Sequence, residues 1–600
     1  MTTGLATGWM LGATPTGLVA IGPDVDVDIA GDPDRALTLV PTLAGWSAET
    51  PNDGDPELET LAEQLRRLGA FGAPGPRPDG CSLADALRED QAGRAPDGVV
   101  WTADEALLLP AELPAPERSR ALRAFTVGLR PGSRRAAYGA LLGGRGSVHG
   151  DVPDRDRLRR RIAASGGEGE SVAVVELADG GTRWTVGPGG VDAIDAAAVH
   201  RLGPIRWIAD PVPVIADDPD LLLCLAEVAG AGSAVATATP DRLVQGIGTA
   251  EHATLVARAE AAERYAAGDT SRATLRLARR ADLPGALDPG ELFRRDPAGP
   301  VDSADAASDE LPRHWTTAQA HDGSLRWVPA ETIFLSLPHA ADPSVVIPWS
   351  SSGMAAHSDL ESARERALAE LVERDAFVWT WLQRVSRERV TTGIPDAAAS
   401  RRRTLARHGW TTTWVNLSLD SFPVILCGLT HERRGLVLGA ACAPDPGSAL
   451  VRATTEAFAL ALRYPDDGTP PPDPEEVRSP RDHLRLHLDP ARRPEHGFLL
   501  AGADEVDLRD VATAEGEDLG ERLAALGHAP LTVDLTGPSS APFSVVRALA
   551  PGLLPLTFGW GNEPTGLPRA HEPVTDRAGR AIGQRLAYGV SAGRLPHPFP

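Results

Sequence analysis

The sequence contains no lysine, so its 59 basic residues are all arginines. This absence excludes a Walker P-loop, which requires a lysine beside its Ser or Thr. It also excludes the protein-kinase pattern with its strand lysine, and chemistry through a lysine Schiff base. Any nucleotide site in this chain must therefore be built from arginines, carboxylates and metal ions.

Cysteine is scarce as well: the four cysteines are Cys81, Cys224, Cys427 and Cys442, and none forms a C-x-x-C pair. This spacing argues against a zinc-thiolate site and a disulfide framework. No apolar run is long enough to cross a membrane. The N-terminus "MTTGLATGWMLGATP" lacks the basic region of a signal peptide. We therefore expect a cytoplasmic protein with no membrane partner.

The balance of charge is strongly acidic, with a formal net charge of −23. Nucleic-acid binding needs a basic surface, so a nucleic-acid partner is not expected. The chain has 600 residues, of which 42% are hydrophobic, which is enough for several globular domains with sizeable cores.

Periodicity predicts an N-terminal module followed by a less regular middle region. "VDVDIA" alternates as a half-buried strand does, and Leu58, Leu61, Leu65 and Leu68 form one stripe of a helix. Further on, "SVAVVEL" and "TRWTVGP" flank 179–181 as a hairpin would. No glycine-rich dinucleotide fingerprint follows a strand, and from about residue 200 the pattern is mixed α/β.

Two predicted helices carry the same frame, A-E-x-x-E-R-x-A. In the first, at 250–266, the frame contains Glu260, Glu263 and Arg264; in the second, at 359–386, it contains Glu370, Glu373 and Arg374. Glutamates three apart on a helix repel each other by roughly 0.2–0.5 kcal/mol. Either these are two solvated acidic faces, or four carboxylates converge on hard cations such as Mg²⁺, which suits phosphates.

The start of the second helix is open to two interpretations. Ser358 and Glu361 fit a capping box, and Glu361 is equally a candidate metal ligand. Farther along, Ser362, Arg366, Glu370 and Glu373 share one helix face. A polar stripe inside a domain needs partners, and a highly charged ligand is one way to supply them.

The stretch "SSSGMAAHSDLESARERALAELVERDAFVWTWL" resembles the central signature of YcaO-domain proteins. "GIGTAEHATLVARAEAAERYAAGD" resembles the earlier acidic helix of that family, and "DPGSALVRATTEAFALALR" its third nucleotide-site helix. "VVRALAPGLLPLTFGWGNEPTG" and the terminal "LPHPFP" complete the resemblance, which spans about 200–600.

The resemblance implies a site that binds ATP through Mg²⁺ without a P-loop. The implied metal ligands are Glu260, Glu263, Glu361, Glu370 and Glu373. The implied nucleotide-site residues are Glu260, Glu263, Arg264, Arg366, Glu370, Glu373, Arg374, Arg452, Glu456 and Arg463. In azoline-forming members, a Cys, Ser or Thr side chain of a ribosomally made peptide attacks the preceding carbonyl. ATP then phosphorylates the oxygen, and loss of phosphate leaves a thiazoline or oxazoline.

The chain ends in P-x-P-x-P, formed by Pro596, Pro598 and Pro600. Such a tail is either disordered or a preformed polyproline II rod that docks at little entropic cost. The resemblance implies the rod, with the three prolines at the catalytic site, and so favours the cyclodehydratase branch.

For the whole chain we expect an α/β (mixed α+β) fold in three parts. Residues 1–75 resemble a winged-helix module that binds the leader of a precursor peptide as an added strand, although a generic small α/β module fits as well. Residues 76–199 are a linker and a partner-like middle region without zinc, and 200–600 are the YcaO domain. The resemblance also implies a homodimer, with a partner cyclodehydratase subunit and a flavin dehydrogenase in the same pathway.

Several family positions are changed in this sequence. Ile247 stands where a lysine is usual, Val256 and Ser358 replace a usual Ser and Asn, and Ser362 replaces a common glutamate. Arg366 replaces a common Gln or His. Two hypotheses therefore follow: an ATP-dependent peptide cyclodehydratase, or a non-catalytic YcaO scaffold that binds the leader and positions another enzyme.

Overall fold

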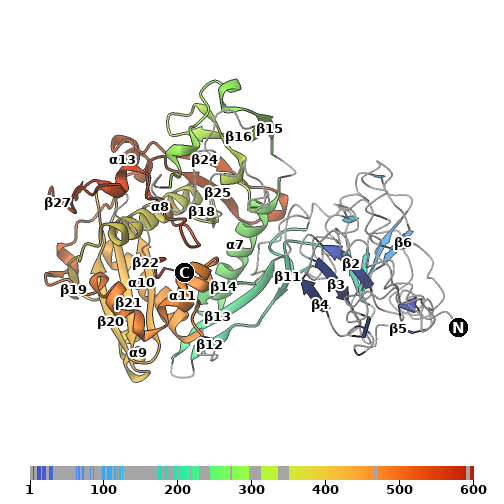
Figure 1. Cartoon of the computed structure of the whole chain (residues 1–600), viewed down its shortest axis with the longest axis horizontal. Coiled ribbons are helices and arrows are strands. Elements are labelled where there is room, and N and C mark those ends of the chain that lie inside the picture. The colour runs from blue at the N-terminus through green and yellow to red at the C-terminus, as the bar shows by residue number, and fades with distance from the viewer. Residues whose placement is uncertain are drawn as a thin grey trace. The chain divides into compact units, whose positions relative to one another are not determined.

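The computed structural model divides into two compact units (Figure 1): Met1–Trp207 with Glu227–Arg242, and Ile208–Ala226 with Leu243–Pro600. The residues that the structure describes are 194–200, 202–215, 218–228, 243–270, 273–295, 312–335, 350–463, 470–588 and 595–599, together with strands and short segments between 4 and 186.

The N-terminal unit contains a three-stranded antiparallel sheet in the order β2-β3-β4. Its strands are β2 (Met10–Thr14), β3 (Gly17–Ile21) and β4 (Asp26–Ala30). The strand predicted at "VDVDIA" is therefore confirmed. Leu65 of the predicted leucine stripe is helical and fully buried. Leu58, Leu61 and Leu68 lie outside the described residues.

A second sheet of this unit has the order β10-β9-β8-β7-β6. Its strands are β6 (Cys81–Ser82), β7 (Gly98–Trp101), β8 (Glu105–Leu109), β9 (Ala173–Glu176) and β10 (Arg183–Thr185). The predicted hairpin is confirmed, because β9 and β10 pair antiparallel with Arg183 opposite Val175. The turn at 179–181 lies outside the described residues.

The C-terminal unit is built on two larger sheets. The six-stranded sheet has the order β15-β16-β24-β25-β18, with β17 also paired to β16. Its strands are β15 (Arg276–Ala278), β16 (Arg313–Ala320), β17 (Leu325–Pro329), β18 (Met354–His357), β24 (Leu531–Asp534) and β25 (Ser544–Leu549). The five-stranded sheet has the order β22-β21-β20-β19-β23. Its strands are β19 (Arg389–Thr392), β20 (Trp410–Asn416), β21 (Val424–His431), β22 (Gly435–Cys442) and β23 (Glu505–Asp507).

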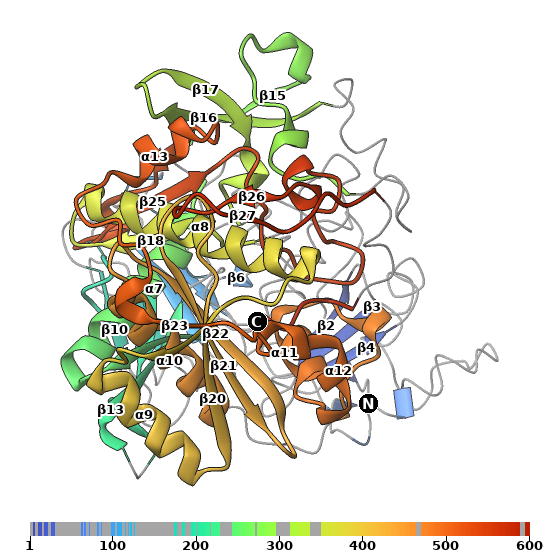
Figure 2. The ribbon, with the colours of Figure 1, turned by 90° about the vertical axis from the view of Figure 1, so that its left-hand side faces the viewer.

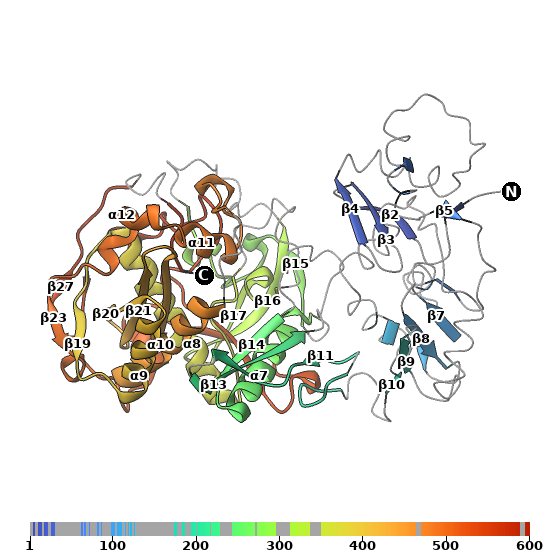
Figure 3. The ribbon, with the colours of Figure 1, turned by 90° about the horizontal axis from the view of Figure 1, so that it is seen from below.

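Helix α8 (Leu360–Gln383) lies between these two sheets and contacts β18, β25 and β22 (Figure 2). Alternate residues of β21 and β22 face opposite ways, as the period of two requires. Leu426 and Leu438 pack toward α8, whereas Ile425 and Val437 belong to a second core. That second core is shared with α9 (Asp396–Arg407) and α10 (Pro446–Arg463) (Figure 3). The three predicted helices are found at Ala250–Gly268, Leu360–Gln383 and Pro446–Arg463.

Helix α7 (Ala250–Gly268) packs on β14 (Leu243–Gly248), which pairs with β13 (Asp218–Val228) beside β12 (Val212–Ile215). The contact depends on Gly246, because a Cβ atom there would lie 1.9 Å from the Ala253 carbonyl oxygen. A glycine allows the same close approach between β22 and α10: a Cβ atom on Gly439 would lie 2.5 Å from the Ala453 carbonyl oxygen. Each helix is thus seated directly on its strand.

The start of α8 differs from the prediction. Asp359 is the N-cap, and its Oδ1 accepts the N–H of Ser362 at 2.8 Å. The capping box predicted for Ser358 and Glu361 is therefore wrong, because the next residue supplies the carboxylate instead. Among the helices in the described part of the chain, none is both long and apolar enough to cross a bilayer.

Candidate active site

The first acidic pair lies on the inner part of α7. Glu263 is only 8% exposed, and burial and the neighbouring Glu260 raise its pKa well above the usual range. Arg264 opposes this effect: its Nη2 lies 2.7 Å from Oε1 of Glu260. The local repulsion predicted for the pair is thus offset by an arginine of the same helix turn.

The second acidic pair, on α8, is arranged in the same way. Nη2 of Arg374 lies 3.4 Å from Oε1 of Glu370, and its Nε lies 3.5 Å from Oε1 of Glu373. Glu373 is 6% exposed, and burial, Glu456 and Glu370 raise its pKa to about 8 against the opposing charge of Arg374. Its carboxyl group therefore takes up a proton near neutral pH unless a further cation arrives.

A tight turn before α8 supports Glu370. The N–H of Gly353 donates to Oε2 of Glu370 at 3.2 Å. Gly353 has φ +82°, and a Cβ atom there would lie 2.6 Å from the Ala548 oxygen. Only glycine fits this left-handed and crowded position, which gives the Ser/Gly-rich stretch before the helix a physical reason.

Helix α10 contributes Glu456 and Arg452. Oε2 of Glu456 accepts the N–H of Ala440 at the edge strand β22, at 3.0 Å, and Nη1 of Arg452 donates to the Cys442 oxygen at 3.1 Å. Burial raises the pKa of Glu456, while Arg374 lowers it. The predicted Arg463 is the last residue of α10, and its side chain lies outside the described part.

Two more arginines complete the group. Arg366 stays solvent-exposed, although the surrounding protein and the charge of Arg452 lower its pKa; Glu373 opposes that effect. Arg547 of β25 was not singled out in the sequence. It is 5% exposed, and burial lowers its pKa to about 10 against the charges of Glu370 and Glu263. An arginine inside an apolar strand, "SVVRAL", was the available signal.

These side chains form one electrostatic unit, which we call the acid–arginine network. Its members are Glu260, Glu263, Glu370, Glu373, Glu456, Arg264, Arg366, Arg374, Arg452 and Arg547. Glu370 perturbs the pKa of groups on all of the contributing elements, including Glu263 on α7 and Glu456 on α10. With five carboxylates and five guanidinium groups, the network is formally neutral.

The network has unused capacity for a ligand. Nη1 of Arg374 and Nη1 of Arg547 are buried with no hydrogen-bond partner among the described residues. Guanidinium donors match phosphate oxygens, and carboxylate oxygens match Mg²⁺. As the side chains lie, however, no three acidic, His or Cys groups in the described part are arranged to hold a metal ion.

Glu361 lies apart from the network. Its side chain is 66% exposed and pairs with Arg364 at 3.4 Å. It precedes Glu370 by nine residues, which corresponds to about 13.5 Å along a helix. The predicted metal-binding role of Glu361 therefore gains no support from its position.

The C-terminal tail reaches the network. Pro596 and Pro598 are buried, and the fully buried Phe599 ring lies 4.4 Å from the Arg374 guanidinium carbon. The same ring lies 4.9 Å from the Phe377 ring, centroid to centroid. Pro600 lies outside the described residues.

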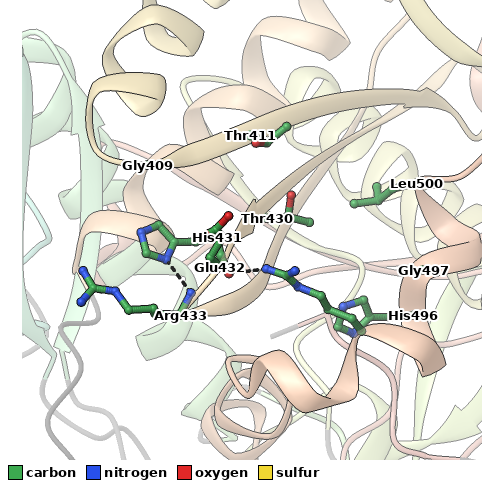
Figure 4. A pocket seen from close by; sticks show the side chains of 10 residues that line it. Gly409, Thr411, Thr430, His431, Glu432, Arg433, His496, Gly497 and Leu500 are labelled. Carbon is green, nitrogen blue, oxygen red and sulfur yellow. Dashed lines mark hydrogen bonds between the residues drawn. The ribbon is translucent and has the colours of Figure 1, made fainter.

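A separate pocket of about 690 Å³ lies at one end of β20 and β21 (Figure 4). Its lining residues are Gly409, Thr411, Thr430, His431, Glu432, Arg433, Arg493, His496, Gly497 and Leu500. Arg493 donates from Nη2 to the His431 carbonyl oxygen at 3.0 Å. None of these residues belongs to the acid–arginine network.

Comparison with known families identifies the chain. Residues 245–554 match the family described as YcaO cyclodehydratases that bind ATP and Mg²⁺. The chain belongs to the YcaO family. It is an ATP-dependent cyclodehydratase, so the predicted enzyme, ATP and Mg²⁺ are confirmed, and the scaffold alternative is not retained.

Two solved structures with TM-scores above 0.5 support the same fold. One is described as a heterocyclase in complex with substrate and cofactor, with 14% identity, a TM-score of 0.58 and 100% of both chains covered. Another is the heterocyclase TruD, with 15% identity, a TM-score of 0.53 and the same coverage. A YcaO protein from Methanopyrus kandleri bound with AMPPCP and Mg²⁺ shares 20% identity over 60% of this chain and 89% of that one, with a TM-score of 0.46. A search of the curated proteins gave no match.

Proposed function

We propose that this YcaO protein converts Cys, Ser or Thr residues of a ribosomally made precursor peptide into thiazolines or oxazolines. The observation that carries the proposal is the acid–arginine network, which gathers carboxylates and unsatisfied guanidinium donors from α7, α8, α10 and β25. Such a donor set suits a metal-bound triphosphate. A purely structural role would not require this many buried and partly buried charges in one place.

Within the network, we assign Glu260, Glu263, Glu370 and Glu373 as the side chains that would hold Mg²⁺. Glu260, Glu370 and Glu373 each pair with an arginine of their own helix, and the charge of Arg264 lowers the pKa of Glu263 against the effects of burial and Glu260. The ion would supply positive charge that offsets the negative charge of the triphosphate. For these carboxylates to hold the ion, their contacts with Arg264 and Arg374 would have to loosen, which would free guanidinium groups for the phosphates.

The arginines have a distinct task in this proposal. Arg264 and Arg374 already lie beside the carboxylates, and their planar donors bind phosphate oxygens in pairs. Arg366 and Arg452 add charge from the neighbouring turns of α8 and α10, with Glu456 and Arg463 on the same helix as Arg452. Together these residues would orient the terminal phosphate toward the peptide.

The proposed chemistry proceeds in three steps. The side-chain sulfur or oxygen of the peptide attacks the preceding carbonyl carbon and gives up its proton. The resulting oxyanion attacks the γ-phosphorus of ATP, and ADP leaves. The amide nitrogen then loses its proton as the carbon–oxygen bond breaks, so phosphate leaves and a C=N bond forms within the ring that the first attack closed.

Pro596, Pro598 and Pro600 are proposed to act at the catalytic site by presenting the end of the tail to it. The contact of Phe599 with Arg374 supports this placement. A polyproline II segment is extended before it binds, so docking costs little conformational entropy.

The rest of the chain is proposed to serve the peptide. Residues 1–75 would bind its leader, 76–199 would be the partner-like middle region, and 200–600 the catalytic domain. An edge strand of a small sheet such as β2-β3-β4 is a suitable place for an added strand. We further propose that the protein forms a homodimer and is located in the cytoplasm. Its partners in the pathway would be a second cyclodehydratase subunit and a flavin dehydrogenase.

The decisive experiment uses the full chain with a candidate precursor peptide, ATP and Mg²⁺. Each ring formed removes one water from the peptide, which mass spectrometry detects, and one ATP is consumed per ring. Omitting ATP or chelating Mg²⁺ should stop both changes. A peptide that loses water without any ATP turnover would contradict the proposed phosphorylation.

A further inference from the structure

Two buried histidines hold the backbone of the C-terminal tail. Nδ1 of His483 lies 2.8 Å from the carbonyl oxygen of His597, and Nε2 of His487 lies 2.8 Å from that of Pro596. Both histidines are at most 1% exposed. Two consecutive carbonyl groups of the tail are therefore each paired with a separate imidazole. We call His483 and His487 the tail-binding histidines.

The spacing of these histidines follows from their helix. They lie four residues apart on α11 (Pro480–His487), so their side chains project from one face. The helix begins at a capping box in which Ser479 accepts the N–H of Asp482. A well-capped short helix thus presents two donors to one extended segment.

The tail needs these donors because of its composition. Proline has no N–H, so recognition of this backbone relies on its carbonyl oxygens. A polyproline II segment makes no internal hydrogen bonds and is normally satisfied by water. Pro596 and His597 are buried, so their carbonyl groups must be paired by the protein instead.

The hydrogen bonds define one consistent proton arrangement. His483 donates from Nδ1 to the tail, and its Nε2 accepts the N–H of Gly559 at 3.0 Å. His487 donates from Nε2, which leaves its Nδ1 to accept from Nδ1 of His496 at 3.3 Å. Both tail-binding histidines are therefore neutral, and each uses both ring nitrogens.

Aromatic contacts connect this arrangement to α8. The His487 ring meets Trp381 edge to face at 6.0 Å, and the His597 ring meets Phe377 in the same way at 5.9 Å. Beyond His597, Phe599 packs on the guanidinium of Arg374. The tail thus contacts, through Phe599, the arginine that pairs with both Glu370 and Glu373.

We propose that His483 and His487 are positioning residues for the nucleotide site: they hold the Pro596–His597 backbone so that Phe599 keeps Arg374 between its two carboxylates. The inference rests on the proposed function of the acid–arginine network. It assigns to α11, which contributes nothing to that network, a role in the affinity for Mg·ATP. The role acts through the tail alone.

The test compares His487→Leu with His487→Gln in the full chain. Leucine removes the donor and leaves the Pro596 carbonyl unpaired, whereas glutamine keeps a side-chain N–H. Titration with a non-hydrolysable ATP analogue and Mg²⁺ should show a dissociation constant raised about tenfold for leucine and by less than about twofold for glutamine. His571→Gln is the matched control, because His571 is equally buried but bonds to Thr565 within its own segment.

The mechanism is tested by a chain that ends at Leu595. If the histidines act through the tail, His487→Leu should have no further effect on Mg·ATP affinity in the shortened chain. An equal loss in the full and shortened chains would overturn the inference. So would unchanged affinity in His487→Leu while the wild type binds Mg·ATP.

Two further measurements separate other outcomes. If the wild type itself fails to bind Mg·ATP, the proposed function fails rather than the role of the histidines. If His487→Leu does not fold, Phe599→Leu replaces it, since this change removes the ring over Arg374 and should weaken Mg·ATP binding to a similar degree. Normal affinity in Phe599→Leu would then refute the proposal.

Discussion

Two polar clusters of opposite character lie in the described part of the C-terminal unit. The acid–arginine network consists of ionisable side chains that face one another across α7, α8, α10 and β25. The histidine cluster (His483, His487, His496 and His597) consists of neutral rings whose hydrogen bonds run mainly to backbone carbonyl groups. The two meet where Phe599 touches Arg374.

The difference lies in how each group offsets the cost of burial. The two tail-binding histidines use both ring nitrogens, whereas Nε2 of His496 and Nδ1 of His597 have no hydrogen-bond partner among the described residues. Buried charges need partners of opposite sign, and the network keeps raised carboxyl pKa values and unpaired guanidinium nitrogens even after internal pairing. An unpaired buried charge points to a ligand more strongly than an unpaired neutral ring nitrogen does, because burying a charge costs more free energy.

The largest effect is expected from Glu373→Gln, which removes one carboxylate from the network. Ring formation at saturating peptide should fall at least about 100-fold, because a metal-binding carboxylate is lost. Glu365→Gln, an exposed glutamate on the same helix, is the matched control. Retention of full activity by Glu373→Gln, measured by mass spectrometry over an Mg²⁺ titration, would remove Glu373 from the proposed site.

A third buried group differs from the network, because the carboxylate oxygens in it all accept hydrogen bonds from one arginine. Arg569 contacts both oxygens of Asp375 and both oxygens of Asp420, at 2.7–3.0 Å. Arg569→Met should lower the free energy of unfolding by about 3–5 kcal/mol, since it leaves two buried carboxylates unpaired. The shift in the urea midpoint measures this. A large loss of Mg·ATP affinity with unchanged stability would show that the triad belongs with the ligand site.

The histidine cluster predicts acid sensitivity. Burial lowers the pKa from 6.5 to about 4 for His483 and His496 and to about 3 for His487. The unfolded chain therefore binds protons below pH 6.5 that the folded chain does not bind. Stability is fully present above pH 6.5 and falls by up to about 1.4 kcal/mol per pH unit for each histidine as the pH drops toward 4.

Thermal melts between pH 7 and pH 4.5 test this expectation. His487→Gln should show a shallower fall than the wild type, because one titrating group is removed. The nearby charges do not reverse the sign: Asp482 favours protonation of His483, while Arg492 and Arg493 disfavour it at His487 and His496. Equal slopes for wild type and variant would contradict the assignment.

The smallest effect is expected from Glu361→Gln. Its exposed carboxylate makes one surface ion pair, which is worth about 0–1 kcal/mol. The Mg²⁺ dependence of ring formation should change by less than about twofold. A tenfold rise in the Mg²⁺ concentration needed for half-maximal activity would restore Glu361 to the metal site.

The features that the sequence predicted depend on residues close together in the chain, whereas the features that it missed depend on residues far apart. The helix with Glu370 and Glu373 was predicted because its spacing and flanking residues are local. The N-cap was missed by one position, since Ser358 and Asp359 are both good caps and only the backbone decides between them. Periodicity likewise placed β4, β9 and β10.

The missed residues depend on distant partners. Arg547 donates to Thr332 and Ser350, which lie 215 and 197 residues away. The tail-binding histidines reach across 114 and 109 residues. In "PRDHLRLH" they look like ordinary members of an amphipathic helix, and nothing local marks their carbonyl partners. Such pairs become visible only when the chain has folded.

The seating of α7 and α10 on Gly246 and Gly439 has a consequence for redesign. A single methyl group at either position would shift a whole carboxylate-bearing helix away from its sheet. To change the nucleotide preference, one should therefore substitute individual side chains of the site, such as Arg366 on α8. The positions of α7 and α10 on their sheets should be left unchanged.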